Sequence, residues 1–209
     1  MKHAPGIWRL TLLASLSMSI SLPPFALAFS AAYDQDVTTQ GQQPMHSKVL
    51  IKDGYFRIET VVEGMRAIVV KNNEGTFQYL PDQNLVMPMP AVGPNSQLIE
   101  HPDDYLGYLR EQNAKLLRTE TVRGYVCEVY AYDDPKSRSA VTAWVAKQLQ
   151  FPVRVEMDGA EGRMQVELKN IVLGAGIEDS AFVLPAGAQT MSMDKLMQGV
   201  SGLLEKRGQ

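Results

Sequence analysis

The stretch "SKVLIKDGYFRIET" (Ser47–Thr60) decides the fold class of this chain. Apolar and polar side chains alternate on both sides of Asp53-Gly54, a pair that favours the tight turn of a β-hairpin. Val49 and Ile51 therefore share one face of the first strand, and Phe56 and Ile58 alternate in the same way in the second. The stretch predicts two antiparallel strands.

The same pattern continues toward the C-terminus. Turn-forming residues at Glu63-Gly64 and at Asn72–Gly75 separate apolar runs, and Pro81–Asn84 provides a further turn with proline at an early position. We therefore predict an antiparallel meander from Met45 to Pro90.

The next stretch, "NLVMPMPAVGP" (Asn84–Pro94), contains two Met-Pro pairs. Met87 and Met89 share one face of the strand, whereas Pro88 and Pro90 have no backbone N–H to donate to a neighbouring strand. The stretch predicts a strand at the margin of the sheet, with flexible apolar side chains on one face.

A short helix is predicted after this strand. Pro102 is followed by Asp103 and Asp104, which is typical of a helix N-terminus. Apolar residues at helical spacing follow: Tyr105, Leu106 and Leu109. Alternating segments then resume and predict further strands within Arg118–Tyr132, Ser139–Leu149, Phe151–Asp158 and Arg163–Gly174, and Ile177–Met191 ends the sheet region.

The two termini differ from the body of the chain. Residues 1–28 have a basic start, a short apolar core with several serines and an Ala-x-Ala end, which predict a cleaved signal peptide. We expect residues 29–190 to form one domain. In residues 191–209, Leu196, Met197 and Val200 have helical spacing, which predicts a C-terminal amphipathic helix.

Composition excludes several classes of protein. The formal net charge is −3, which argues against a nucleic-acid-binding protein. No second segment is long and apolar enough to cross a bilayer, and the single cysteine, Cys127, rules out an internal disulfide and is far from the lipidation position. An exported, soluble, periplasmic protein is the prediction.

Motifs of catalysis are missing from the sequence. After the predicted signal peptide only His46 and His101 remain, and the sequence contains no H-E-x-x-H, C-x-x-C, G-x-S-x-G or phosphate-binding glycine loop. Cys127 lies on an apolar strand and is interpreted as a buried small residue rather than a reactive thiol. We predict a protein that is not an enzyme and holds no cofactor or metal.

Methionine is frequent, with eleven in the chain. Several of these residues lie at alternating strand positions, where they either fill an ordinary core or line a deformable apolar cavity. Composition alone leaves both interpretations open.

The C-terminal half, "TAWVAKQLQFPVRVEMDG" with "GRMQVELKNIVLGAGIEDSAFVLPAG", resembles the periplasmic LolA/LolB-like lipoprotein-sorting proteins. The residues that carry the resemblance are Trp144, Phe151-Pro152, Asn170, Asp179, Phe182, Pro185 and Gly187. The paired strands around Ser47–Thr60 and Thr76–Pro90 are similar too. The chain looks like an uncharacterised branch of this superfamily.

This resemblance implies a mainly β (α+β) fold: an open, strongly curved antiparallel half-barrel of about ten strands with a short helical lid and a C-terminal helix. It also implies an apolar cavity and a role in outer-membrane biogenesis. The residues expected in the cavity wall are Val49, Ile51, Phe56, Ile58, Met87, Met89, Trp144, Val153, Val155, Met164, Val166 and Leu168. The expected lid residues are Tyr105, Leu106 and Leu109.

Two functions remain open at this point. The first is a non-catalytic carrier or receptor for acyl chains of a lipoprotein or lipid, which could also bind a membrane-associated partner protein. The second is an envelope sensor or interaction module that binds a partner protein or peptide with the same fold and transfers no lipid. Under the second hypothesis, the chain's own side chains and helices fill the cavity.

Overall fold

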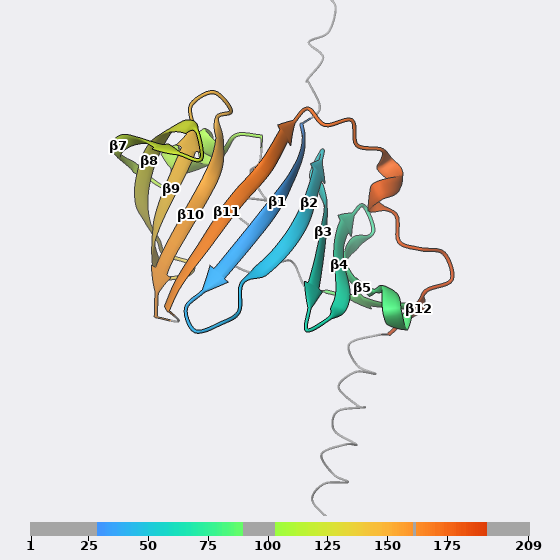
Figure 1. Cartoon of the computed structure of the whole chain (residues 1–209). Helices are drawn as coiled ribbons and strands as arrows, with labels where there is room; N and C mark the ends of the chain where they lie inside the picture. Colours follow the sequence, from blue (N-terminus) through green and yellow to red (C-terminus); the bar gives the residue numbers. More distant parts are fainter. Residues whose placement is uncertain (1–28, 90–102, 161, 192–209) are drawn as a thin grey trace, which may run out of the picture.

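The computed structural model describes residues 29–89, 103–160 and 162–191. The predicted signal peptide and the predicted C-terminal helix within residues 192–209 lie outside the described residues, as do Pro90, His101 and Pro102. Figure 1 shows the described part as one open, curved sheet with few helical turns. The predicted fold class, an open and curved antiparallel sheet, is confirmed.

The first half of the sheet is built from short strands joined mostly by tight turns. Its members are β1 (Ser30–Thr39), β2 (Met45–Lys52), β3 (Tyr55–Val62), β4 (Met65–Asn72), β5 (Gly75–Leu80) and β6 (Leu85–Pro88). Asp53 and Glu63 have φ near +50° and each precedes a glycine with φ above +80°, which is the geometry of tight hairpin turns. The meander predicted from Met45 onward is confirmed.

The second half follows the helix. It consists of β7 (Lys115–Val122), β8 (Tyr125–Asp134), β9 (Ser139–Ala146), β10 (Phe151–Gly159), β11 (Gly162–Leu173) and β12 (Gln189–Thr190). Arg123-Gly124 forms the turn between β7 and β8, as predicted. Three helical segments complete the described chain: α2 (Tyr105–Glu111), η1 (Pro81–Gln83) and η3 (Asp179–Phe182).

The strand order is β12-β6-β5-β4-β3-β2-β1-β11-β10-β9-β8-β7. Every described pairing is antiparallel except the short parallel one between β12 and β6. That pairing involves only Leu85 and Val86 of β6, so the half of the strand that contains Pro88 lies at the margin of the sheet. The proline therefore occupies a position where no strand of the described chain needs its N–H.

β1 joins the two halves, with β2 on one side and β11 on the other. No strand was predicted at Ser30–Thr39, which is one reason why the described sheet has twelve strands where about ten were predicted. Asp34, Gln35 and Asp36 make this segment polar. Its pairing with β11 joins residues more than 120 positions apart, and no local pattern encodes such a contact.

The inner face of the sheet is defined here as the face against which α2 packs. The largest apolar cluster lies there and combines α2 residues with strand residues such as Tyr33, Val49, Phe151 and Val166. A single sheet has no second sheet to cover it, so the helix supplies the cover over part of this face.

The opposite, outer face carries two smaller clusters. One, near β7–β10, contains Cys127, Val129 and Trp144. The other lies over β4, where Phe182 of η3 packs against Ile68 and Val70. The segment after β11 thus crosses the outer face before β12 joins the far edge of the sheet (Figure 1).

Polar contacts fix the position of this crossing segment. Lys52 donates a hydrogen bond to the Ile177 carbonyl at 2.9 Å, and Asn72 Nδ2 donates to the Phe182 carbonyl at 3.1 Å. Arg57 Nη1 donates to the Ala181 carbonyl at 3.2 Å. The segment is therefore attached to β2, β3 and β4 by both apolar packing and hydrogen bonds.

We predict that Phe182→Ala lowers the free energy of unfolding by about 3 to 5 kcal/mol, because it removes a fully buried aromatic side chain from the outer cluster. Val183→Ala is the matched control, because the Val183 side chain is 64% exposed. This substitution should change the free energy of unfolding by less than about 0.5 kcal/mol. Urea unfolding followed by tryptophan fluorescence measures both. Equal effects would contradict the role assigned to Phe182.

Candidate functional site

The predicted wall residues of the inner face come mostly from the centre of the sheet. The structure brings eight of the twelve together in or against the main apolar cluster: Val49, Ile51, Phe56, Ile58, Val155, Met164, Val166 and Leu168. Strand alternation places them there, because register pairs such as Ile51 with Phe56 and Val166 with Val155 put the side chains of both partners on one face. Whether these residues contact a ligand remains a prediction.

Trp144 and Val153 belong elsewhere. Both lie in the outer cluster, so the structure corrects their placement in the wall. Trp144 alternates with the inward residues Ala143 and Val145, and its indole N–H donates to Glu120. A register shift between Pro152 and Arg154 adds one residue to β10, and this bulge turns Val153 to the outer face.

The two predicted methionines of β6 lie at the margin. Met87 pairs with Gln78, which pairs with Val69, so the register places Met87 on the inner face. Met89 follows the strand, is half-buried, and its backbone N–H donates to the Thr76 carbonyl at 2.8 Å. Neither methionine belongs to the main cluster in the described chain.

The predicted lid residues are in contact with the inner face. Tyr105 and Leu109 are buried in the main cluster, and Leu106 packs against it. As predicted, an acidic residue precedes the helix: the carboxylate of the N-cap Asp104 accepts a hydrogen bond from the Gly107 N–H at 2.8 Å. A Cβ at Gly107 would lie 2.0 Å from Asp104 Oδ2, so glycine permits this close cap.

Two tyrosines that the sequence analysis missed link α2 to the sheet. The hydroxyls of Tyr108 on α2 and Tyr132 on β8 are 3.3 Å apart, and their rings meet edge to face. Burial raises the pKa of Tyr132, and it also raises the pKa of Tyr105, so these hydroxyls remain neutral. The "YLGYL" spacing of Tyr105 and Tyr108, three residues apart on a helix, was the available signal.

One end of the inner face carries apolar side chains that are exposed in the described part of the chain. Met65, Val62 and Met45 are 50%, 45% and 38% exposed. Val62 pairs with Met65, and extending the β2–β3 register by two residues beyond the Ser47–Thr60 pair brings Met45 opposite Val62. The three side chains therefore form one exposed apolar row across β2, β3 and β4 on the inner face, which the sequence analysis also missed.

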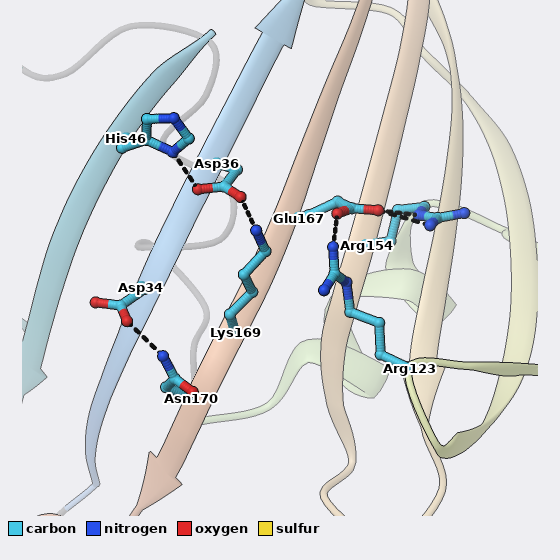
Figure 2. A network of polar contacts seen from close by, with 8 residues as sticks. All are labelled: Asp34, Asp36, His46, Arg123, Arg154, Glu167, Lys169 and Asn170. Atoms are coloured by element: carbon cyan, nitrogen blue, oxygen red, sulfur yellow. Dashed lines mark hydrogen bonds and ion pairs between the residues drawn. The ribbon is translucent and has the colours of Figure 1, made fainter.

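The outer face is polar between its two clusters. Figure 2 shows Asp36 between His46 and Lys169: His46 Nδ1 lies 2.6 Å from one carboxylate oxygen, and the Lys169 ammonium donates to the other. The hydrogen bond from Lys169, followed by that from His46, outweighs burial and lowers the pKa of Asp36. This carboxylate is fully engaged across β2, β1 and β11.

Glu167 on β11 has a similar role nearby. It accepts hydrogen bonds from Arg154, at 2.6 Å, and from Arg123 (Figure 2). Burial raises the pKa of Glu167, but the hydrogen bonds from the two arginines outweigh burial and lower it. The Arg154 guanidinium also lies 5.5 Å from the centre of the Trp144 ring, so the ion pairs and the outer cluster support each other.

A groove of about 630 Å³ lies beside this network on the outer face. Asp36, His46 and Lys169 line one part of it, and Arg66 and Ile68 of β4 line another. Phe182 of the crossing segment packs on Ile68 and Val70 of β4. The groove lies next to this cluster on the same face, because Ile68 also lines it.

Reactive chemistry is not concentrated anywhere in the described residues. They include no group of three or more His, Cys, Asp or Glu side chains placed to hold a metal ion. Cys127 is buried, as predicted, and burial raises the pKa of its thiol. Within the part of the chain that the structure describes, no helix is long and apolar enough to cross a membrane.

Known structures are similar to this one. MucB in the MucA/MucB complex of Pseudomonas aeruginosa is 14% identical with a TM-score of 0.50, and the match covers 78% of this chain and 58% of MucB. The chain thus spans little more than half of MucB. LprF from Mycobacterium bovis is 14% identical with a TM-score of 0.47, covering 78% of this chain and 90% of LprF.

A LolA superfamily protein from Nitrosomonas europaea is 11% identical with a TM-score of 0.37, and the match covers 75% of this chain and 90% of that protein. No protein-family model matches the sequence, and no curated protein matches it. The predicted resemblance to LolA-like proteins is confirmed. At these identities it is a likeness of fold alone.

Glu167 yields a prediction about pH. Its pKa is lowered in the folded state, so it stabilises the protein above its usual value of 4.5, and this contribution is lost as the pH falls through that range. We expect Glu167→Gln to cost about 1 to 2 kcal/mol at pH 7. The variant should then lose less stability than the wild type between about pH 6 and pH 3.

Urea unfolding at several pH values measures this difference. Asp158→Asn is the control, because its ion pair with Arg163 is 3.6 Å long and exposed, and such pairs contribute little. Parallel pH profiles for the wild type and Glu167→Gln would contradict the assignment.

Proposed function

We propose that this protein is a non-catalytic binding protein that holds an acyl chain of a lipid or lipoprotein on its inner face beneath α2. The observation that supports this most directly is a continuous row of apolar side chains across the strands. From the exposed end to the covered part, the row contains Met65, Val62, Met45, Val37, Val166, Val155 and Ala143.

The row passes from solvent into the core. Met65 and Val62 are about half exposed, whereas Val37, Val166 and Val155 are buried in the cluster that includes α2. A ligand that lay along this row would therefore enter at an accessible end and finish beneath the helix. Burial contributes about 0.8 kcal/mol per methylene, so a long alkyl chain would gain enough free energy to displace the helix locally.

The chemistry of the row favours an acyl chain over a peptide. It presents apolar side chains from strands whose backbone groups pair with their neighbours in the sheet. A peptide lying there would bring backbone N–H and C=O groups without partners, which is costly, whereas a hydrocarbon chain brings none. Methionine at two positions of the open end suits a ligand of variable shape.

The helix α2 would act as the cover. Tyr105 and Leu109 fill the space above the inner face in the structure, and the Tyr108–Tyr132 contact links the helix to β8. Filling of this space by the chain's own side chains is also what the interaction-module hypothesis expects. Binding of an acyl chain would require α2 to move outward and exchange its contacts for contacts with the ligand.

The cellular setting belongs to the same proposal. Residues 1–28, which lie outside the described chain, would direct export to the periplasm and be removed. Acyl chains of lipoproteins and lipids are abundant in that compartment's two membranes, and a soluble carrier would bind them there.

Adjacent residues of β3 give a sharp test. Val62 lies on the inner face and Val61, 59% exposed, on the outer face of the same strand end. We expect Val62→Glu to weaken binding of a fluorescent fatty acid by about tenfold or more, because a charge would lie beside the alkyl chain. Val61→Glu adds the same charge on the other face and should leave the affinity unchanged.

Titration of the purified protein by fluorescence anisotropy measures both variants, and their thermal unfolding confirms that they are folded. Equal loss in the two variants would indicate a general charge effect and count against the inner-face site. Failure of the wild type to bind the probe would overturn the proposed function.

A second candidate function is supported by a separate observation, the groove on the outer face. The polar groove of about 630 Å³ offers both charges and the apolar Ile68 to a partner protein. MucB, which shares the fold, is known in complex with the MucA periplasmic segment. In this alternative the protein is an interaction module or sensor that transfers no lipid.

Native mass spectrometry of protein purified from the periplasm separates the two candidates. Co-purified lipid on the wild type, lost in Val62→Glu, supports the carrier. A lipid-free protein that binds no fatty-acid probe and crosslinks to another protein through Lys169 or Lys48 at the groove supports the alternative.

A further inference from the structure

Tyr33 presents an unused donor to the inner face. Its side chain is 3% exposed and packs against Phe151, with the ring centres 5.8 Å apart. Its hydroxyl is buried and has no hydrogen-bond partner in the described residues. Buried polar groups in folded proteins are nearly always hydrogen-bonded, and an exception calls for a physical reason.

The backbone of β11 opposite Tyr33 is irregular. The β1–β11 register shifts between Ala32 and Asp34, so that Asn170 and Ile171 of β11 lie opposite the single residue Tyr33. Asn170 has a left-handed φ of 52°, which marks the bulge. On the outer face its Nδ2 donates to Asp34 at 2.6 Å, as Figure 2 shows.

This contact holds the bulge from outside while the Tyr33 ring faces inward. Tyr33 pairs with Val49 on β2, which lies in the same inner cluster. Bulges frequently redirect side chains near functional sites. Here the bulge of β11 lies directly opposite Tyr33, the residue with the unpaired hydroxyl, while the regular β1–β2 register points the ring inward.

The hydroxyl is suited to donate. Burial raises the pKa of Tyr33, so the group keeps its proton at neutral pH. Its neighbours Val49 and Phe151 are apolar and offer no acceptor. An acceptor would have to arrive with a ligand, and it would have to be neutral, because a charge in this apolar cluster would be poorly solvated.

We propose that the Tyr33 hydroxyl donates a hydrogen bond to the carbonyl oxygen of a neutral acyl group, an ester or amide, so that the site selects esterified acyl chains over free fatty acids and hydrocarbons. This proposal rests on the proposed function and specifies its ligand class. The alkyl chain would extend from Tyr33, which lies four positions from Val37 on the same face of β1, toward the apolar row. The carbonyl would satisfy the only buried side-chain donor or acceptor found without a partner in the described chain.

Three ligands of similar length test this selection: methyl dodecanoate, dodecanoate and tridecane. Each would compete with a fluorescent fatty acid for the wild type, Tyr33→Phe and Tyr130→Phe. Tyr130 is the matched control, because it packs against the same cluster but its hydroxyl already donates to Glu128 at 2.7 Å.

We expect Tyr33→Phe to weaken binding of methyl dodecanoate by about fivefold and to leave tridecane unchanged, as loss of one hydrogen bond predicts. Tyr130→Phe should leave both unchanged. The wild type should prefer the ester to dodecanoate. Tyr33→Phe should also unfold at the same or a higher temperature than the wild type, because it removes an unpaired buried hydroxyl.

Other results would overturn the proposal. If Tyr33→Phe weakens ester and tridecane equally, or weakens neither, the hydroxyl does not bind the carbonyl, although the inner face still binds acyl chains. A marked loss of thermal stability in Tyr33→Phe would show that the hydroxyl has a partner within the protein. If the wild type binds none of the three ligands, the proposed function fails as well.

Discussion

The packing of α2 on the inner face is the contact on which the rest of the structure depends. A single curved sheet cannot cover its own apolar face, so the helix must bury part of the side chains that the strands present there. Tyr105, Tyr108 and Leu109 do this over one part of the sheet. The exposed row at Met45, Val62 and Met65 lies outside the cluster that α2 covers. Because α2 is short, it covers only part of the inner face and leaves the exposed row as the proposed entry for a ligand.

The two faces differ in how their polar groups are satisfied. On the outer face Asp36 contacts His46 and Lys169, Glu167 accepts from Arg123 and Arg154, and Asn170 donates to Asp34. These contacts connect β2, β1, β11 and β10 and need no ligand. On the inner face the Tyr33 hydroxyl has no partner among the described residues. The paired charges of the outer face contribute to stability. The inner face, with its apolar surface and the unpaired Tyr33 hydroxyl, is the better candidate for ligand binding.

Much of the fold was predictable because its information is local. Turn residues such as Asp53-Gly54 and Arg123-Gly124, together with period-two alternation, gave the hairpins and the antiparallel class. The same alternation placed Val49, Ile51, Val166 and Leu168 on one face. Acidic residues before Tyr105 identified the start of the helix. Each of these inferences needs only neighbours within a few residues of one another.

Sequence by itself therefore determined the hairpins, the inner-face residues of the regular strands and the short helix. Only the tertiary structure decided the placement of Trp144, Val153 and Tyr33. Pairing between residues distant in sequence placed β1 between β2 and β11. The bulge in β10 turned Val153 outward, and the bulge in β11 placed two residues opposite Tyr33. A bulge shifts every later side chain by one position, so period-two alternation fails at that point. Its location depends on the partner strand, which the local sequence does not specify.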